Sequence, residues 1–332
     1  MITARGPYFD ELEIGQMFRD APGITLTEGG AATHQAIVGD RLQLALNHEL
    51  SQRVTGRRGL VHPAYVWNTA IGQSTLATHH VRANLFYRGL AFHHAPYLGD
   101  TLSSTTEVVG LRENSRRPGR AATGLVGLHI VTRDQHGERV LDFHRCAMLP
   151  LSDESVSTGH ADDFDALGPD LGAADFTSDW DLSACRLHDA VPALTTGTVI
   201  QVVGGDVICS APELARLTGN VAQVHYDARA AGGTRLVYGG HTIAVALGQI
   251  SRALPQVVTV LGWQGCDHLG PVHEGDTLRS TVEVLATRSR DGGGNLVDLH
   301  CKVAADVPDL TAEGRPVLDW RFTALVSDSG SP

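Results

Sequence analysis

The apolar residues of this chain follow two periodicities, one helical and one alternating. Within an apolar stretch at about 239–253, large aliphatic side chains recur at i, i+4, i+7 and i+11: Ile243, Leu247, Ile250 and Leu254. This spacing places them on one face, so we expect a long helix that buries one stripe. A similar apolar stretch at about 62–78 predicts a second long helix in the first half of the chain.

Each predicted helix is followed by three segments in which apolar and polar residues alternate, as in half-buried strands. These segments span 101–108, 122–132 and 139–149 in the first half, and 277–285, 296–303 and 317–326 in the second half. Gly-Asp pairs precede the first segment of each set, as turns do between antiparallel strands. One long helix with antiparallel strands that wrap around it predicts an α+β unit in each half.

The two halves also repeat each other in sequence. PYLGDTLSSTTEV at 96–108 matches PVHEGDTLRSTVEV at 271–284, so that Asp276 lies 176 residues after Asp100. The same offset places LVHPAYVWNTAIGQ on LVYGGHTIAVALGQ. Such self-similarity predicts two copies of one fold, side by side, with their sheets continuous.

We therefore divide the chain into an N-terminal unit (1–152), an acidic linker (153–190) and a C-terminal unit (191–332). The linker is crowded with Asp, Gly and Ser and has no apolar period, so at most a short helix is expected in it. A chain of 332 residues is long enough for two units of about 150 residues that each bury a core.

Composition narrows the classes of function. The chain is 42% apolar and 19% charged, a soluble globular mix, and no apolar run approaches the ~20 residues that span a bilayer. Its net charge of −11 argues against a nucleic-acid partner. The five cysteines form no CxxC pair, and the N-terminus lacks a signal-peptide pattern. We expect a cytoplasmic protein with reduced thiols and with neither nucleic acid nor a membrane as its partner.

Two histidine pairs, His79-His80 and His93-His94, raise the question of a metal site. Neighbouring residues on one element point in different directions, and no spacing of Asp, Glu or Cys completes a ligand set, so no metal is expected. The sequence also contains no Walker loop, GxSxG elbow or HExxH motif, which leaves the ATP-binding and hydrolase classes without support.

The two copies differ at one early position. GDRLQLA in the first half contains Asp40 and no histidine, whereas GNVAQVH in the second half contains Asn220 and His225 but no aspartate. The segments LTGNVAQVHYD and RLVYGGHTIAVALGQ resemble the second half of the MaoC-type dehydratases, the double hot-dog (R)-specific enoyl-CoA hydratases. With ANLFYRGLAFHHAPYLGDTL, they look most similar to the mesaconyl-CoA (2-methylfumaryl-CoA) hydratases, also called β-methylmalyl-CoA dehydratases.

This resemblance implies two tandem hot-dog folds that form a pseudo-dimer with one working site. The family's motif, G-D-x-N-P-x-H, uses Asp and His to hold a water molecule. Carried over by position, His225 is expected to be the acid/base, since imidazole can both accept and return a proton near neutral pH. Asn220 stands at the Asp position, where an amide can position water but cannot take its proton. A structural histidine that caps its own loop is the alternative for His225.

The second proton-transfer group stays open at this point. His225 alone could carry the proton both ways, which we favour, or Asp40 could reach in from the other copy. The remaining polar motif positions around Asp40 are lost, so the first unit is expected to be catalytically degenerate and to shape the acyl pocket.

Gly239 and Gly240 stand where the second long helix begins. Their backbone N–H groups lie at the positive end of the helix and are expected to bind the thioester oxygen, although an ordinary tight helix entry needs glycine too. Tyr87 and Tyr238 are further candidates for substrate binding. Arg88 or His241 would meet a free acyl carboxylate, unless Arg88 forms only a surface ion pair. A cluster of arginines is expected either to contact the phosphates of coenzyme A or to be solvated: Arg112, Arg116, Arg117 and Arg120.

The expected function is the reversible hydration and dehydration of a short branched or dicarboxylic 2-enoyl-CoA, first of all mesaconyl-CoA and β-methylmalyl-CoA. No cofactor is implied beyond the coenzyme A carrier, and hot-dog sheets suggest association into a homo-oligomer. Two alternatives stay open. One is a MaoC-like dehydratase of a natural-product pathway that acts on another acyl carrier. The other is a non-catalytic acyl-binding protein, since fold alone does not fix function.

Overall fold

The computed structural model describes residues 5–168, 175–185, 191, 193–306 and 314–328. Four long strands lie in the first half: β3 (Ala83–Phe92), β4 (Thr101–Glu113), β5 (Thr123–Arg133) and β6 (Arg139–Pro150). Four lie in the second half: β9 (Val257–His268), β10 (Thr277–Ser289), β11 (Asn295–Asp306) and β12 (Arg315–Val326). Short strands complete the set: β1 (Met17–Phe18), β2 (Ile24–Thr25), β7 (Val199–Gln201) and β8 (Asp206–Val207).

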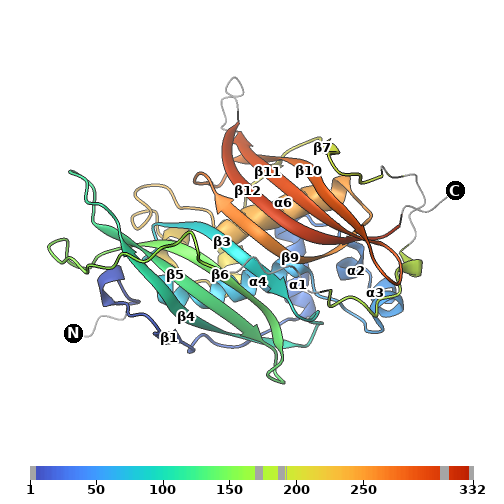
Figure 1. Cartoon of the computed structure of the whole chain (residues 1–332), viewed down its shortest axis with the longest axis horizontal. Helices are drawn as coiled ribbons and strands as arrows, with labels where there is room; N and C mark the ends of the chain where they lie inside the picture. The colour runs from blue at the N-terminus through green and yellow to red at the C-terminus, as the bar shows by residue number, and fades with distance from the viewer. Residues whose placement is uncertain (1–4, 169–174, 186–190, 192, 307–313, 329–332) are drawn as a thin grey trace.

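In the described part of the chain these strands form one antiparallel sheet in the order β1-β4-β5-β6-β3-β9-β12-β11-β10-β7, with β2 beside β4 and β8 beside β10. The sheet runs without a break from the green strands of the first half to the red strands of the second, with α4 (Pro63–Gln73) and α6 (Gly239–Ala253) behind it (Figure 1). The predicted continuity of the two sheets and the α+β class are thus confirmed.

The remaining helices lie around these two. The α-helices are α1 (Glu28–Val38), α2 (Gln43–Leu46), α3 (His48–Thr55) and α5 (Ala211–Leu217); the 3-10 helices are η1 (Phe9–Glu11), η2 (Ser74–Thr78), η3 (Leu182–Ala184) and η4 (Gln223–His225). The helix predicted at 62–78 is divided into α4 and η2, whereas that at 239–253 is α6. No helix within the described ranges is long and apolar enough to cross a membrane.

Every residue of α4 is buried, because the sheet covers one side of the helix and α6 packs on another. Trp67 of α4 meets Trp263 of β9 edge to face, with 4.8 Å between ring centroids, and Trp320 of β12 at 6.1 Å. These tryptophans come from both halves, so the hydrophobic core extends across the junction between them.

The junction itself is a strand pair that the sequence patterns did not predict. β3 and β9 lie antiparallel, with Tyr87 opposite Cys266 and Leu90 opposite Trp263. β3 also pairs with β6, and β9 with β12, so each joins its own half to the other. The structure therefore adds one long strand and two short ones to each predicted set of three.

Two equivalent glycines let each long helix contact the other half at close range. A Cβ atom on Gly72 of α4 would lie 2.0 Å from the carbonyl oxygen of Thr218, and one on Gly248 of α6 would lie 2.8 Å from that of Val38. Real Cβ atoms do not come this close, so only glycine fits at both positions. Each helix thereby fixes the loop that precedes the early motif position of the opposite half.

The acidic segment after β6 packs against the protein wherever it is described. The Asp162 carboxylate accepts a hydrogen bond of 2.8 Å from the Leu111 N–H, and Phe164 is buried against the glycines of β4 and β5. Trp180 is buried near η3, the only helix in the described part of this segment. The expected short helix is present, but the segment covers the sheet rather than spacing two units apart. The exact unit boundaries stay a prediction.

Candidate active site

A cavity of about 400 Å³ lies between the two halves of the chain. From the first half it is lined by residues of α4, η2, β3 and β6; from the second half it is lined by the η4 loop, the start of α6 and the segment after β9. Five of the predicted site residues line it: Asn220, His225, Tyr238, Gly239 and Tyr87. We therefore take this cavity as the candidate active site.

His225 is the last residue of η4 and is almost completely buried. Its Nδ1 lies 2.8 Å from the carbonyl oxygen of Leu236, so Nδ1–H donates to this oxygen and the lone pair is left on Nε2. Burial, with a further contribution from the charge of Arg145, lowers the pKa of His225 to about 4 despite the bond to Leu236. The imidazole is thus neutral near pH 7, and its Nε2 can accept a proton.

Asn220 lines the same cavity and carries an amide donor that the described part of the protein does not pair. Its Oδ1 accepts a hydrogen bond of 2.9 Å from the Ala222 N–H, which settles the orientation of the amide. The Nδ2 atom is buried and has no hydrogen-bond partner among the described residues. A buried amide without a partner is costly, so this position favours a bound acceptor such as a water oxygen.

The first half of the chain holds the loop that carries Asn220 and His225. The Val221 N–H donates to Thr75 Oγ1 at 2.9 Å, and the Gln223 N–H donates to the His79 carbonyl oxygen at 3.1 Å. Both partners lie at or just after η2. The site is therefore assembled only when the two halves are docked.

Gly239 and Gly240 are the first two residues of α6, so their N–H groups have no acceptor within the helix. Gly239 lines the cavity, and a Cβ atom on it would lie 2.7 Å from His268 Nε2. Gly240 does not line the cavity; a Cβ atom there would lie 2.1 Å from Asn68 Oδ1 of α4. Close packing against α4 accounts for glycine at position 240, whereas Gly239 lines the cavity and its role in binding the thioester oxygen stays a prediction.

Two buried tyrosines form part of the wall. The Tyr238 hydroxyl donates to the Asn68 carbonyl oxygen at 3.0 Å, and its ring centroid lies 5.7 Å from that of His225. Burial raises the pKa of both Tyr87 and Tyr238 above the usual range, so both stay protonated and act as hydrogen-bond donors.

Besides Gly240, three predicted residues do not line this cavity. Arg88 forms an ion pair with Asp267 at 2.6 Å, and its side chain lies against Gly168 of the acidic segment. His241 is buried within α6 and does not line the cavity. Asp40 lines a second hollow of about 450 Å³ and pairs with His62 at 2.9 Å. The structure does not bring the Asp40 carboxylate to His225.

Sequence reasoning missed seven polar residues of the wall: Thr75, Thr78, Arg82, Asn84, Arg145, Thr242 and His268. Arg145 could have been found from its position on β6, where every second residue is buried: Leu141, Phe143, Arg145, Ala147 and Leu149. An arginine at an inward position of a strand is unusual, because such positions face the core. For Asn84 and His268 the sequence carries no comparable signal.

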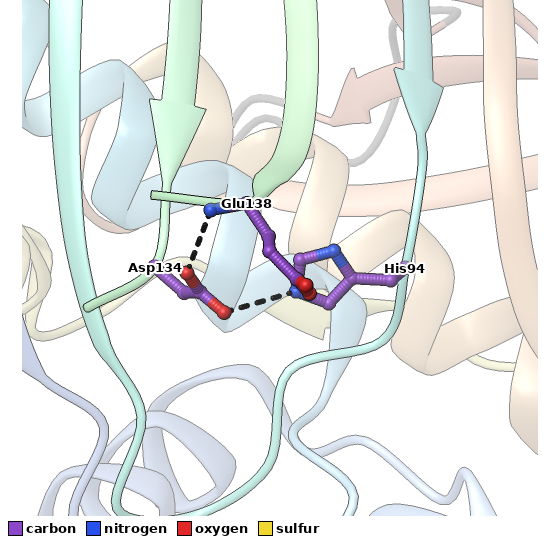
Figure 2. A group of neighbouring side chains, drawn as sticks. All are labelled: His94, Asp134 and Glu138. Carbon is purple, nitrogen blue, oxygen red and sulfur yellow. Dashed lines mark hydrogen bonds and ion pairs between the residues drawn. The ribbon is translucent and has the colours of Figure 1, made fainter. Parts of the chain in front are cut away.

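Neither histidine pair is among the residues that line the active-site cavity. His80 stacks on Tyr8, with 4.1 Å between centroids. His94 comes close to Asp134 and Glu138 of the β5–β6 turn, with ligand atoms within 4.8 Å of one another (Figure 2). Spacing along the chain could not reveal this group, because it forms across a strand pair. One Asp134 oxygen already accepts the Glu138 N–H at 3.0 Å, which makes it part of the turn.

Comparison with known proteins returns no matching family model. The chain is 28% identical to the β-methylmalyl-CoA dehydratase of Chloroflexus aurantiacus, over 99% of both chains. It is 27% identical to the mesaconyl-CoA hydratase of Cereibacter sphaeroides, over 86% of this chain and 85% of that one. A candidate MaoC domain dehydratase from Chloroflexus aurantiacus has a similar structure, with a TM-score of 0.85 and 27% identity over 99% of both chains.

One solved structure is more similar in sequence. It is a conserved hypothetical protein of Mycobacterium tuberculosis with a double hot-dog fold, 50% identical, with a TM-score of 0.91 over 96% of this chain and 98% of that one. This chain belongs to the MaoC-like double hot-dog hydratase/dehydratase family. At the motif positions of the present chain, the first unit has an acidic residue, Asp40, but no histidine, whereas the second unit has a histidine, His225, but no acidic residue.

Proposed function

We propose that the protein catalyses the reversible hydration and dehydration of a short 2-enoyl-CoA, with mesaconyl-CoA and β-methylmalyl-CoA as the first pair of substrates to test. One observation carries the proposal. In a cavity between the halves, the buried imidazole of His225 is neutral and can accept a proton at Nε2, and the side-chain Nδ2 of Asn220 is a hydrogen-bond donor without a partner among the described residues. The names of the two curated relatives supply the substrate pair.

In the hydration direction, Asn220 Nδ2–H holds the oxygen of a water molecule and His225 Nε2 removes one of its protons. The resulting hydroxide forms a C–O bond with the β-carbon, while the electron pair of the double bond moves toward the thioester oxygen. The Gly239 N–H, at the N-terminus of α6, donates to this developing enolate oxygen. Dehydration follows the same steps in reverse.

His225 can also supply the second proton transfer. A buried imidazole with a pKa of about 4 gives a strongly acidic imidazolium, which returns its proton to the α-carbon of the enolate. Asp40 cannot share this work from its place in the second hollow. We therefore propose that a single histidine carries the proton in both directions.

The coenzyme A moiety would enter past Arg82, the exposed cation of the cavity wall. Of the arginines predicted for its phosphates, Arg116 donates to the carbonyl oxygens of Glu154 and Val156, and Arg112 stacks on Phe164. Arg117 and Arg120 line a separate hollow, where contact with the carrier stays a proposal.

All five cysteines are free, which supports the proposed cytoplasmic location. No cofactor is proposed, and association into a homo-oligomer stays a prediction.

The test follows the loss of enoyl-thioester absorbance with mesaconyl-CoA and, in parallel, crotonyl-CoA. His225→Gln is expected to lower kcat at least ~100-fold, because its amide cannot accept a proton. His136→Gln, at an exposed turn, is the matched control and should keep wild-type rates.

Turnover by the His225→Gln protein at the wild-type rate would contradict the assigned role of His225. No turnover of either thioester by the wild-type protein would contradict the hydratase proposal and favour acyl binding without catalysis.

A further inference from the structure

A buried arginine of the first half, Arg145, lines the active-site cavity from the middle of the sheet. It lies on β6 directly opposite Tyr87 of β3 and is 3% exposed. Its Nη2 donates to Thr78 Oγ1 and, at 3.4 Å, to the Ser74 carbonyl oxygen, so the guanidinium lies under η2 and lines the cavity.

The charge of Arg145 is not neutralised by the protein. Among the described residues no carboxylate forms an ion pair with it, and its buried Nε has no hydrogen-bond partner. Arginine keeps its proton even when buried, and an unpaired buried charge is strongly unfavourable. The cavity therefore provides a place for an anion beside this guanidinium.

The fold itself does not require an arginine here. The repeat aligns Asp142-Phe143 with Asp319-Trp320, so Arg145 corresponds to Phe322 in the second half. Phe322 is completely buried in the hydrophobic core. The same strand position is thus satisfied by a hydrocarbon side chain, and a cation is present only on the strand that faces the candidate site.

We propose that Arg145 binds a free carboxylate that is attached to the β-carbon of the acyl group, and so selects dicarboxylic enoyl thioesters over alkyl ones. This inference rests on the proposed hydration at the same cavity. In a 3-carboxy-2-enoyl thioester the carboxylate is bonded to the carbon that receives water. Its binding group must therefore lie beside the water-activating pair, and the planar guanidinium matches a carboxylate in shape and charge.

Arg145 lines the same cavity as His225 and Asn220, together with Tyr87 and Tyr238. Its positive charge also contributes to the lowered pKa of His225. Asn84 adds a second polar group, since both atoms of its side-chain amide are buried without a hydrogen-bond partner among the described residues. An alkyl group in this position would leave these groups unsatisfied.

The first experiment measures kcat/KM for mesaconyl-CoA and crotonyl-CoA with four proteins: wild type, Arg145→Gln, Arg145→Lys and Arg88→Gln. Arg145→Gln is expected to lower kcat/KM for mesaconyl-CoA roughly 10- to 100-fold, mainly through KM, and to change that for crotonyl-CoA less than ~3-fold. Arg145→Lys should recover part of the loss. Arg88→Gln, the control on the opposite face of the neighbouring strand, should match wild type.

An equal loss on both substrates, or an unchanged value for mesaconyl-CoA, would overturn the inference. A wild-type comparison of mesaconyl-CoA with its 4-carboxamide analogue tests the same point without any substitution, because the amide lacks the charge. The inference expects the amide to bind at least ~10-fold more weakly.

The second experiment separates this inference from the proposed function. Titration calorimetry compares methylsuccinyl-CoA, which has no double bond to hydrate, with butyryl-CoA. If tighter binding of methylsuccinyl-CoA is lost in Arg145→Gln, the inference stands even where no turnover is seen and the hydratase proposal fails. If crotonyl-CoA is hydrated but methylsuccinyl-CoA binds no better than butyryl-CoA, the hydratase proposal stands and this inference is wrong.

Discussion

At the scale of single residues, Asp40 and Asn220 occupy equivalent places in the repeat and have different environments. The Asp40 carboxylate accepts hydrogen bonds from the Leu42 N–H and from Ser251 Oγ, each at 3.1 Å, and lies 2.9 Å from His62 Nε2. The other ring nitrogen of His62 accepts the Ala64 N–H. Through its contacts with His62 and Ser251, Asp40 therefore joins the start of α4 to α6, whereas Asn220 lines a cavity and its amide nitrogen has no hydrogen-bond partner among the described residues.

Replacement of the Asp40 carboxylate should affect folding and not chemistry. Asp40→Asn leaves His62 and Ser251 with a weaker acceptor, so we expect the free energy of unfolding to fall by about 2–4 kcal/mol. Because the carboxylate lies outside the active-site cavity, kcat should stay within ~3-fold of wild type. Urea denaturation and the hydration assay measure the two effects. A large loss of kcat in an Asp40→Asn protein of normal stability would show that Asp40 takes part in the reaction.

At the scale of elements, the sequence predicted those parts of the fold that repeat a simple period. β4, β5, β10 and β11 alternate clearly and were found. β3 was missed because Gly89 has a positive φ of 58° and an irregular register there breaks the alternation. β9 was missed because Val257–Trp263 is buried on both faces and has no alternation to detect. His225 and Asn220 lie in one short motif, whereas the role of Arg145 depends on strands that pair only in the folded chain.

The equivalent glycines of α4 and α6 give an internally controlled test of how the site loop is positioned. Gly72→Ala forces the Thr218 carbonyl away, and the same Cβ atom would lie 3.2 Å from the backbone nitrogen of Asn220. We expect lower stability together with a loss of kcat of ~10-fold or more, because a small misplacement of a catalytic group is costly. Gly248→Ala displaces Val38 on the other side and should lower stability while leaving kcat near wild type.

Thermal unfolding and steady-state rates measure these two effects at a temperature where both variants are folded. Equal losses of kcat in the two variants would show that Gly72 does not position the Asn220 loop.

At the scale of the whole molecule, the protein buries several histidines without neutralising partners. Burial lowers the pKa of His225, His241 and His268 to about 4 each. Burial, with repulsion from His62 and His241, also lowers the pKa of His34 well below its usual range. All four must be uncharged in the folded state near pH 7, and most lie in or around the two hollows between helices and sheet.

This arrangement predicts loss of stability in mild acid. The pKa values of these histidines in the folded state lie below the unfolded value of ~6.5. Between these values the unfolded chain therefore binds protons that the folded chain does not bind. Stability is therefore complete above pH 6.5 and falls as the pH drops toward 4. A shift from 6.5 to about 4 corresponds to on the order of 3 kcal/mol per histidine at the acidic limit.

Thermal denaturation between pH 7 and pH 5 measures the effect, in a range where most carboxylates stay ionised. The midpoint should fall steadily, and His241→Gln, which removes one such group outside the cavity, should make the decline shallower. A midpoint that stays constant across this range would contradict the assignment of these histidines as neutral.

The β3–β9 pair, which joins the two halves within one chain, has a consequence for how selectivity can evolve. In a dimer of identical units every substitution appears twice, so a change that suits one cavity is imposed on its symmetric copy. Here the duplicated halves are encoded separately, and arginine at position 145 coexists with phenylalanine at position 322. Mutations in the first half can therefore tune the acyl preference of the cavity, while the second half, which carries His225, keeps a hydrocarbon side chain at the equivalent position.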